Sequence, residues 1–250
     1  MWTPIEPVLD LLFPPVCAVC GGDVRRGEKE TPSLMIWRGH GICRGCLDKI
    51  SWLSPPFCPR CAMPIRSAAI PSHLCGQCLE TPPPFESALA LLVYGEEVFP
   101  LMHRMKYGPD ASLARYMGVL LARYLGERLS RLGLHAVVPV PLHRLRLRER
   151  GFNQAANMGK AVAKSLGVEL ETDILLRVRA TPAQVGLSRS QRIDNVKGAF
   201  GVSSSKRARK RNLLLVDDVY TTGATLVEAA RALLRAGARE VHVLTFARVP

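Results

Sequence analysis

The chain has 250 residues, of which 48% are hydrophobic and 22% charged, a globular composition long enough for two ordinary domains. It contains no run of the roughly 18 uncharged apolar residues that a membrane helix needs, and its N-terminus lacks a basic segment and a small-residue cleavage site. We therefore expect a cytoplasmic protein without membrane insertion. The net charge of +13 falls almost entirely after residue 84. This excess is compatible with a polyanionic partner, a phosphorylated ligand or solvated surface arginines.

The first 13 residues predict a short amphipathic helix. Val8, Leu9, Leu11 and Leu12 fall on one side of it, and two prolines follow Phe13. We expect this helix to pack against the rest of the protein, with anchoring to a surface as the alternative.

All eight cysteines lie before residue 80 in four C-x-x-C pairs, which predicts two structural zinc sites. Disulfides are disfavoured because no secretory signal precedes the pairs, and a redox C-x-x-C is usually single. Consecutive pairing would form two zinc ribbons, whereas interleaved pairing would form a cross-braced module. We favour consecutive pairing because the stretches between the pairs can form ribbon hairpins. The expected ligands are Cys17, Cys20, Cys43, Cys46, Cys58, Cys61, Cys75 and Cys78.

The chain is expected to divide into an N-terminal unit over residues 1–84 and a second domain over residues 85–250. The first unit is too short to bury much of a core, so metal binding would supply its folding free energy. The proline-rich stretch LETPPPFESA is expected to form a stiff hinge between the two.

Beyond the hinge, strand patterns alternate with helix patterns, which predicts an α/β domain. Such an alternation is typical of a largely parallel, doubly wound sheet with helices on both faces. Ligands of these sheets bind beyond the carboxyl ends of the strands. The expected strands cover residues 88–95, 135–142, 212–218 and 240–249, and the expected helices residues 96–108, 111–133, 151–168 and 224–238.

The stretch LLLVDDVYTTGAT, residues 213–225, combines two acids with a loop suited to an anion. A loop that opens a helix presents backbone N–H groups to an anion, while Asp217 and Asp218 can accept hydrogen bonds from vicinal hydroxyls. The pattern therefore predicts a sugar phosphate as ligand. Walker A and dinucleotide-binding glycine motifs do not occur in the sequence. The hydroxyls expected to converge on the phosphate belong to Thr221, Thr222 and Thr225.

This stretch resembles the signature of the type I phosphoribosyltransferases, which bind 5-phosphoribosyl-1-pyrophosphate (PRPP). That signature is an apolar strand followed by D-D, a hydrophobic residue, any residue, T-T-G, any residue and T, and it is complete from Leu214 to Thr225. The resemblance implies a phosphoribosyltransferase fold that binds PRPP with Mg²⁺. It implies PRPP contacts at Asp217, Asp218, Tyr220, Thr221, Thr222, Gly223, Ala224 and Thr225.

Two further segments, VPVPLHRLRLRERGFNQA at 138–155 and RATPAQVGLSRSQRIDNVKGAF at 179–200, resemble the ComF family. That family joins a zinc-ribbon module to a phosphoribosyltransferase domain and is associated with competence-related DNA uptake. The resemblance implies catalytic roles for Asp217, Asp218 and Arg150. It further implies pyrophosphate contacts at Leu142, His143 and Arg144, and an acceptor hood formed by Arg179, Thr181, Gln184 and Arg192.

Two functions are compatible with these patterns. The first is an enzyme in which PRPP loses pyrophosphate from ribose C1, with Mg²⁺ bridging the pyrophosphate and the ribose hydroxyls, and an unidentified acceptor takes the ribose 5-phosphate. The second is a non-catalytic PRPP sensor that binds single-stranded DNA through basic runs such as KRARKR at 206–211. DNA-uptake or helicase-type proteins are candidate partners under either function.

Overall fold

The computed structural model describes residues 16–22, 24, 40–66, 71–108, 111–182 and 188–250. The helix expected over the first 13 residues and the hood residue Gln184 lie outside these ranges. Within the described part of the chain, no helix is both long enough and apolar enough to cross a membrane.

A five-stranded sheet in which all neighbours are parallel forms the centre of the α/β domain, as the alternation of patterns predicted. Its spatial order is β3 (Ser87–Val93), β9 (Glu240–Arg248), β8 (Asn212–Tyr220), β4 (Ala136–Pro139) and β5 (Glu169–Leu170). After Asn212, the central strand β8 continues with Leu213, Leu214, Leu215 and Val216, all completely buried. A parallel strand covered by helices on both faces is expected to be such an apolar run.

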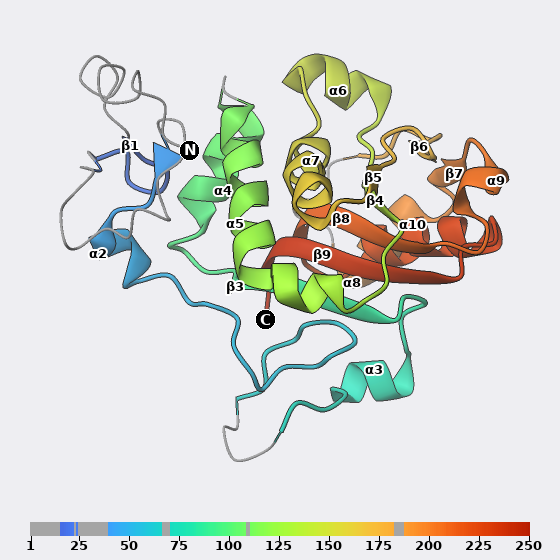
Figure 1. The fold of residues 1–250 in the computed structure, drawn as a ribbon, viewed down its shortest axis with the longest axis horizontal. Coiled ribbons are helices and arrows are strands. Elements are labelled where there is room, and N and C mark those ends of the chain that lie inside the picture. The colour runs from blue at the N-terminus through green and yellow to red at the C-terminus, as the bar shows by residue number, and fades with distance from the viewer. Residues whose placement is uncertain (1–15, 23, 25–39, 67–70, 109–110, 183–187) are drawn as a thin grey trace.

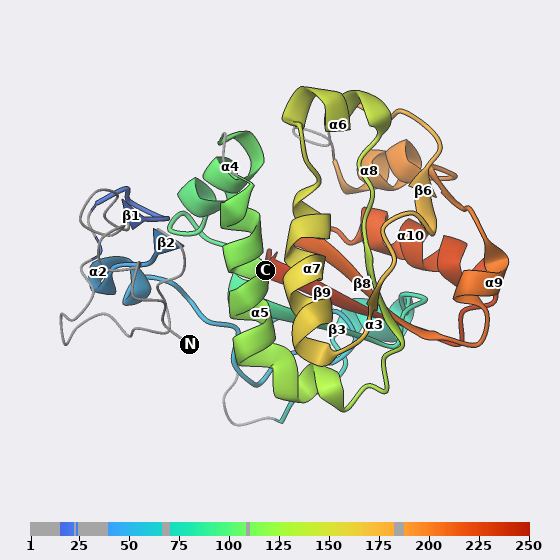
Figure 2. The same ribbon diagram turned by 45° about the horizontal axis from the view of Figure 1, so that its top comes forward.

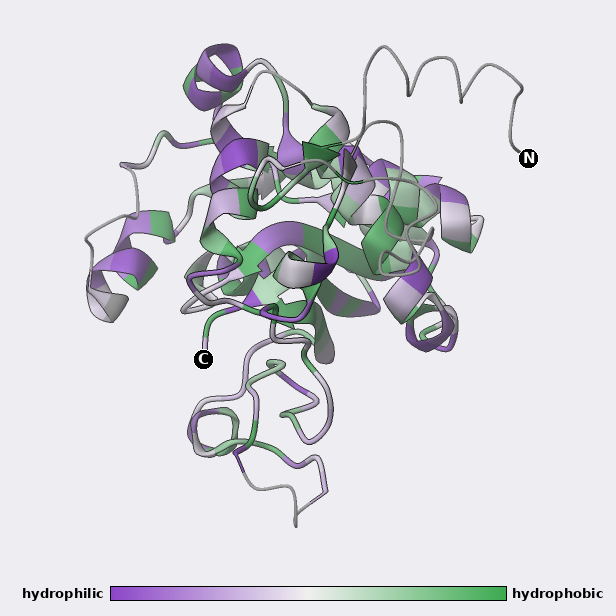
Figure 3. Ribbon diagram, turned by 90° about the vertical axis from the view of Figure 1, so that its left-hand side faces the viewer, coloured by the Kyte–Doolittle hydropathy of each residue, from purple (hydrophilic) through white to green (hydrophobic). Residues whose placement is uncertain are grey.

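Helices cover both faces of this sheet (Figure 1). On one face lie α5 (Ser112–Ser130) and α7 (Gln154–Leu166), and on the other lies α10 (Ala224–Arg235). Side chains of β8 alternate between the two layers: Leu214 joins the core under α5 and α7, whereas Leu215 joins the core under α10. Figure 3 shows the hydrophobic colour concentrated on the sheet at the centre of the molecule.

Several short elements were not predicted from the sequence. A small antiparallel pair, β6 (Leu175–Arg177) and β7 (Phe200–Val202), encloses α8 (Arg189–Val196), and α9 (Ser205–Ala208) follows it. Elements of three to eight residues carry too little periodicity to be recognised from their apolar pattern.

A further short helix, α6 (Arg144–Arg150), lies at the top of the molecule in Figures 1 and 2. Its N-cap is His143, whose side chain accepts from the Leu145 amide, and its C-cap is Gly151 with a left-handed φ of 79°. The helix expected over residues 151–168 is found as α7, and α6 is an additional helix that the sequence did not predict.

The cysteine-rich region contributes two small lobes that lie in different places against the α/β domain (Figure 1). One lobe holds β1 (Val16–Cys17), β2 (His40–Gly41) and α2 (Arg44–Leu47) and lies beside α4 (Phe99–Tyr107). The other holds α3 (Gly76–Glu80) and lies below β3. Residues of both lobes belong to the same buried apolar clusters as the α/β domain, so each lobe packs directly onto that domain.

Helices α5 and α7 pack closely against each other at Gly118. A Cβ at this position would lie 2.4 Å from the carbonyl oxygen of Met158, so we expect Gly118→Ala to lower the free energy of unfolding by about 1–3 kcal/mol. Gly126 lies on the same helix with open space around it, and Gly126→Ala should raise stability by about 0.5–1 kcal/mol. Urea unfolding of both variants measures the difference, and changes of the same sign would contradict this packing.

Candidate functional site

The candidate site is a cavity of about 330 Å³ at the carboxyl ends of β4 and β8. From β4 the chain runs through α7 to β5 on one side of the sheet, and from β8 it runs through α10 to β9 on the other side. The two strands are neighbours, so their ends form the crevice where the direction of winding reverses. Ligands of open α/β sheets bind at this position.

The floor of the cavity carries the acid pair at the end of β8. The Asp217 carboxylate accepts the amide of Asp218 at 2.9 Å, and the Asp218 carboxylate accepts the amide of Val219 at 2.7 Å. Burial, reinforced by the neighbouring Asp218, raises the pKa of Asp217 to about 7, although Lys106 and Arg177 oppose the shift. The two nearby cations therefore do not offset the effect of burial and of the neighbouring carboxylate on the pKa of Asp217.

Lys106 supplies the cation that faces this pair. It lies in the last turn of α4, and its Nζ is 2.9 Å from Oδ2 of Asp218. Burial opposes the charge on the amine, but Asp218 beside it, with Asp217 behind, raises the pKa of Lys106 above its ordinary value. The RMKYG segment, which had no derivable role in the sequence, thus contributes a charged wall of the cavity.

The loop between β8 and α10 turns at Gly223, which has a left-handed φ of 81°. A Cβ on Gly223 would lie 2.6 Å from Cε2 of Tyr220, so both the backbone angle and the packing require glycine. Thr221 and Thr225 line the cavity beside the N-terminus of α10, together with Gly223 and Ala224.

Of the three threonines expected at the phosphate, Thr221 and Thr225 line the cavity and Thr222 does not. The Thr222 hydroxyl accepts the amide of Ala224 at 3.4 Å, and the residue lines a second cavity of about 430 Å³ on the other side of the loop. Tyr220 lines this second cavity too and is only 5% exposed.

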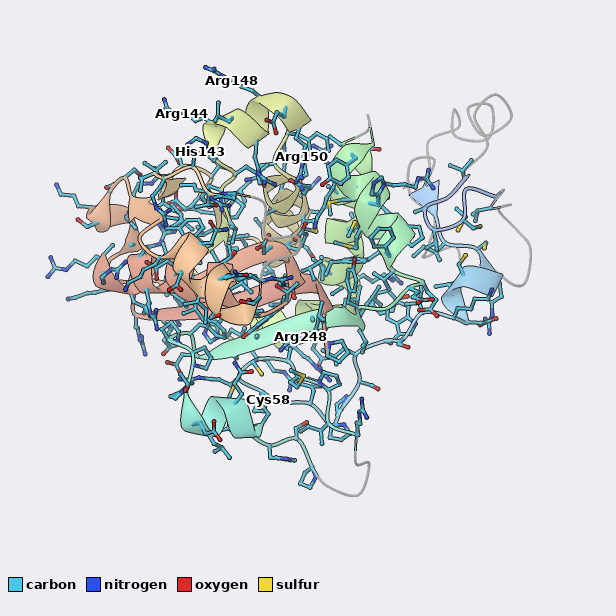
Figure 4. All side chains as sticks on the ribbon, turned by 180° about the vertical axis from the view of Figure 1, so that it is seen from behind. Cys58, His143, Arg144, Arg148, Arg150 and Arg248 are labelled. Carbon is cyan, nitrogen blue, oxygen red and sulfur yellow. The ribbon has the colours of Figure 1, made fainter. Side chains whose placement is uncertain are left out.

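The segment after β4 reaches the cavity through two of the expected residues, Leu142 and Arg150, and through Arg146, which was not expected. Leu142 lines the cavity, whereas His143 caps α6. Figure 4 shows Arg144 and Arg148 extending away from α6, with Arg150 on its inner side. The α6 side chains that line the cavity are Arg146 and Arg150, which share a face because they are four residues apart.

The expected hood residues also take separate places. Arg192 lines the cavity, but Arg179 donates to the carbonyl oxygens of Asn195 at 3.0 Å and Lys197 at 2.7 Å and so braces the end of α8. Thr181 accepts from Arg177 at 2.5 Å. Arg177 itself lines the cavity from β6, and no sequence signal pointed to it because β6 was not predicted.

The eight cysteines form two sets of four, and within each set all sulfur atoms lie within 4.8 Å of one another. The Sγ atoms of Cys20 and Cys43 are 3.8 Å apart, and those of Cys61 and Cys75 are 3.6 Å apart. Tetrahedral zinc with bonds of about 2.3 Å requires sulfur atoms about 3.8 Å apart, so both donor sets fit closed structural sites. Consecutive pairing is confirmed. The sets are Cys17, Cys20, Cys43 and Cys46, and Cys58, Cys61, Cys75 and Cys78.

The basic run at 206–211 is not a free cationic patch. Arg207 and Arg211 both pair with Glu171, and Arg211 pairs in addition with Glu169 at 2.5 Å. Glu171 is a buried carboxylate, so these arginines balance a charge within the fold. Nonspecific phosphate contacts from this run would have to come from its remaining residues.

Comparisons with known proteins agree with this arrangement. A double zinc ribbon domain family matches residues 8–79, and a phosphoribosyl transferase domain family matches residues 153–250. The chain is 33% identical to the DNA utilization protein YhgH of Escherichia coli (84% of this chain, 92% of the relative), and 35% identical to competence protein F of Haemophilus influenzae (84% and 91%). It is also similar to the glutamine PRPP amidotransferase structure from B. subtilis, with a TM-score of 0.40 and 19% identity, covering 57% of this chain and 30% of that chain.

Because the pKa of Asp217 is raised, we expect the ionised form of Asp217 to lower the stability of the folded protein. An unfolded aspartate ionises near pH ~3.9, so between about pH 4 and pH 7 the folded protein binds more protons and loses stability as the pH rises. We expect Asp217→Asn to raise the melting temperature at pH 8, with the gain shrinking toward pH 5. Calorimetry measures this difference.

The control for this experiment is Asp173→Asn, which removes a carboxylate with a 70% exposed side chain that pairs with Arg207. This control should give no gain at pH 8. If Asp217→Asn raises the melting temperature equally at both pH values, the ionised form of Asp217 is not what destabilises the folded protein.

Proposed function

The chain belongs to the ComF family, and from this membership we propose that its α/β domain binds PRPP and transfers the ribose 5-phosphate group to an acceptor. The observation that carries the proposal is a single cavity in which two carboxylates stand beside the N-terminus of α10. Carboxylates recognise hydroxyls and helix N-termini recognise phosphate, and a ribose 5-phosphate presents both groups about one sugar apart.

We assign each group of PRPP to different residues of the cavity. The N-terminus of α10, with Thr221 and Thr225 beside it, would hold the 5-phosphate, and Asp217 and Asp218 would accept the ribose hydroxyls. Arginines on the opposite wall would bind the pyrophosphate through charge-assisted hydrogen bonds. Those arginines are Arg146, Arg150, Arg177 and Arg192.

The transfer breaks the bond from ribose C1 to the pyrophosphate oxygen and forms a bond from C1 to the acceptor. The cavity contributes orientation and charge to this step, because the arginine wall stabilises the departing pyrophosphate while the acids hold the sugar. Lys106 pairs with Asp218 and so balances the charge of one of the two carboxylates. Mg²⁺ bound with PRPP would neutralise further charge on the pyrophosphate.

The wider role is proposed from the relatives. One relative is called a DNA utilization protein and another a competence protein. We propose that this chain also acts in the use or uptake of DNA, that it does so in the cytoplasm, and that DNA-uptake or helicase-type proteins are its partners. We also propose a functional division at residues 84 and 85, between the zinc-binding region and the phosphoribosyltransferase domain.

A second candidate function is PRPP sensing coupled to binding of single-stranded DNA. Three exposed rings form a row along α4: Phe99 stands 6.0 Å from His103, and His103 stands 4.9 Å from Tyr107. Tyr107 lies at the cavity, with the Arg150 guanidinium 5.4 Å from its ring centre. Rows of aromatic rings beside arginines stack the bases of single strands.

The primary proposal is tested by calorimetric titration of PRPP with Mg²⁺. The double variant Asp217→Asn/Asp218→Asn should bind PRPP at least about a hundredfold more weakly, because it removes two charged acceptors worth about 1.5–3 kcal/mol each. Asp173→Asn should bind like the wild type. Unchanged affinity of the double variant would refute the ligand assignment, and PRPP binding without pyrophosphate release for any acceptor would favour the sensor.

The second candidate is tested by anisotropy of a labelled single-stranded oligonucleotide at two salt concentrations. Tyr107→Ala should weaken binding about tenfold, since stacking on one aromatic ring contributes about 1–3 kcal/mol per base. Leu79→Ala, at a residue 66% exposed on α3, serves as the control. Equal binding by both variants would exclude the row on α4 as the platform.

A further inference from the structure

Arg248, the last residue of β9, is a charged side chain that is only 3% exposed. Among the described residues, its guanidinium has no carboxylate partner. It donates to backbone carbonyl oxygens instead: Nε to Cys61 at 2.9 Å, and Nη1 to Tyr220 at 3.1 Å and Thr221 at 2.9 Å. A buried cation without a counter-ion depends on such acceptors for its stability.

These carbonyl groups belong to two features that are far apart in the chain. Cys61 is a member of the second cysteine set, whereas Tyr220 and Thr221 begin the loop that leads into α10. One side chain therefore joins a zinc knuckle to the candidate phosphate loop. Figure 4 shows Arg248 directly above the lobe that contains Cys58.

The ring of Tyr220 completes the connection by packing. The Arg248 guanidinium carbon lies 4.2 Å from the centre of this ring, and Phe85 meets it edge to face at 6.2 Å. On its other side, the ring fills the space that a Cβ on Gly223 would need. Cation, ring and glycine together leave the loop little room to move.

The carbonyl contacts also determine where the loop amides point. In a trans peptide unit the C=O and N–H groups point in opposite directions. Because the carbonyl groups of Tyr220 and Thr221 face Arg248, the N–H groups of Thr221 and Thr222 point away from it. The guanidinium thus orients the peptide units from behind, while Thr221 and Gly223 line the cavity in front.

We propose that Arg248 is a positioning residue that holds the 220–223 loop ready for phosphate, and that the second zinc knuckle supports the loop through it. The proposal rests on PRPP binding at this loop. Zinc holds the knuckle in which the Cys61 carbonyl stands, next to Ala62 with its left-handed φ of 57°. Loss of that metal would release the carbonyl and leave the buried guanidinium short of an acceptor.

The test compares Arg248→Lys and Arg248→Met with Arg60→Met. Arg60 is a matched control because it lies in the same knuckle and anchors it to the domain through the carbonyl and carboxylate of Glu86, both at 3.1 Å, without contacting the loop. We expect Arg248→Met to weaken PRPP binding about tenfold or more, Arg248→Lys to recover part of the loss, and Arg60→Met to bind like the wild type.

Hydrogen exchange of the peptide that covers residues 219–226 separates positioning from general destabilisation. Exchange in this peptide should rise in Arg248→Met and stay at the wild-type level in Arg60→Met, with two zinc ions per chain in both. Equal exchange and equal affinity in the two variants would overturn the proposal. If the wild type itself fails to bind PRPP, the proposed function fails, while the loop exchange still tests the role of Arg248.

The zinc connection is tested by Cys75→Ser alone and combined with Arg248→Met. Cys75→Ser should reduce the zinc content toward one ion per chain and weaken PRPP binding. If Arg248 transmits the effect, the combined variant should bind only slightly more weakly than Arg248→Met alone. If the fold-losses of PRPP affinity in Cys75→Ser and Arg248→Met multiply in the combined variant, the knuckle and Arg248 act independently. That result would overturn the zinc part of the proposal.

Discussion

The parallel pairing of β4 with β8 is the constraint on which the arrangement of the site depends. Val137 pairs with Leu214 and Pro139 with Val216, so β4 ends beside the residue that precedes the acid pair of β8. The chain leaves the two ends in opposite directions, which opens the crevice between them. The apolar run of β8 stabilises the pairing because both of its faces are completely covered.

Charge in the crevice follows from this geometry. Two adjacent acids end one strand, and the surrounding elements contribute cations from α4, α6, β6 and α8. Lys106 partly compensates the acids, yet burial still leaves Asp217 with a pKa of about 7. An ionised Asp217 therefore carries an electrostatic cost that hydrogen bonds from ligand hydroxyls would reduce, and perturbed pKa values of this kind are common in binding sites.

The zinc lobes act on the α/β domain through backbone carbonyl groups. Arg104 of α4 donates to the carbonyl oxygens of Cys17 at 2.8 Å and Ala18 at 3.1 Å in the first lobe, as Arg248 does to Cys61 in the second. Each arginine belongs to an element that borders the cavity or its loop. Small metal-bound lobes are rigid without a large core, so they suit this supporting role.

Local sequence was enough to predict the zinc ligands, the parallel sheet and the acid–loop motif of residues 217–225, because each depends on spacing within a few residues or on the period of one element. Tertiary structure decided the rest of the site. Lys106 meets Asp218 from 112 positions away and Arg177 enters from a strand of three residues, so neither carries a local signal. The arrangement of the loop also needed the fold, because Tyr220 packs on Arg248 at the far end of the chain, and the two cavities that Thr221 and Thr222 line are formed by several elements.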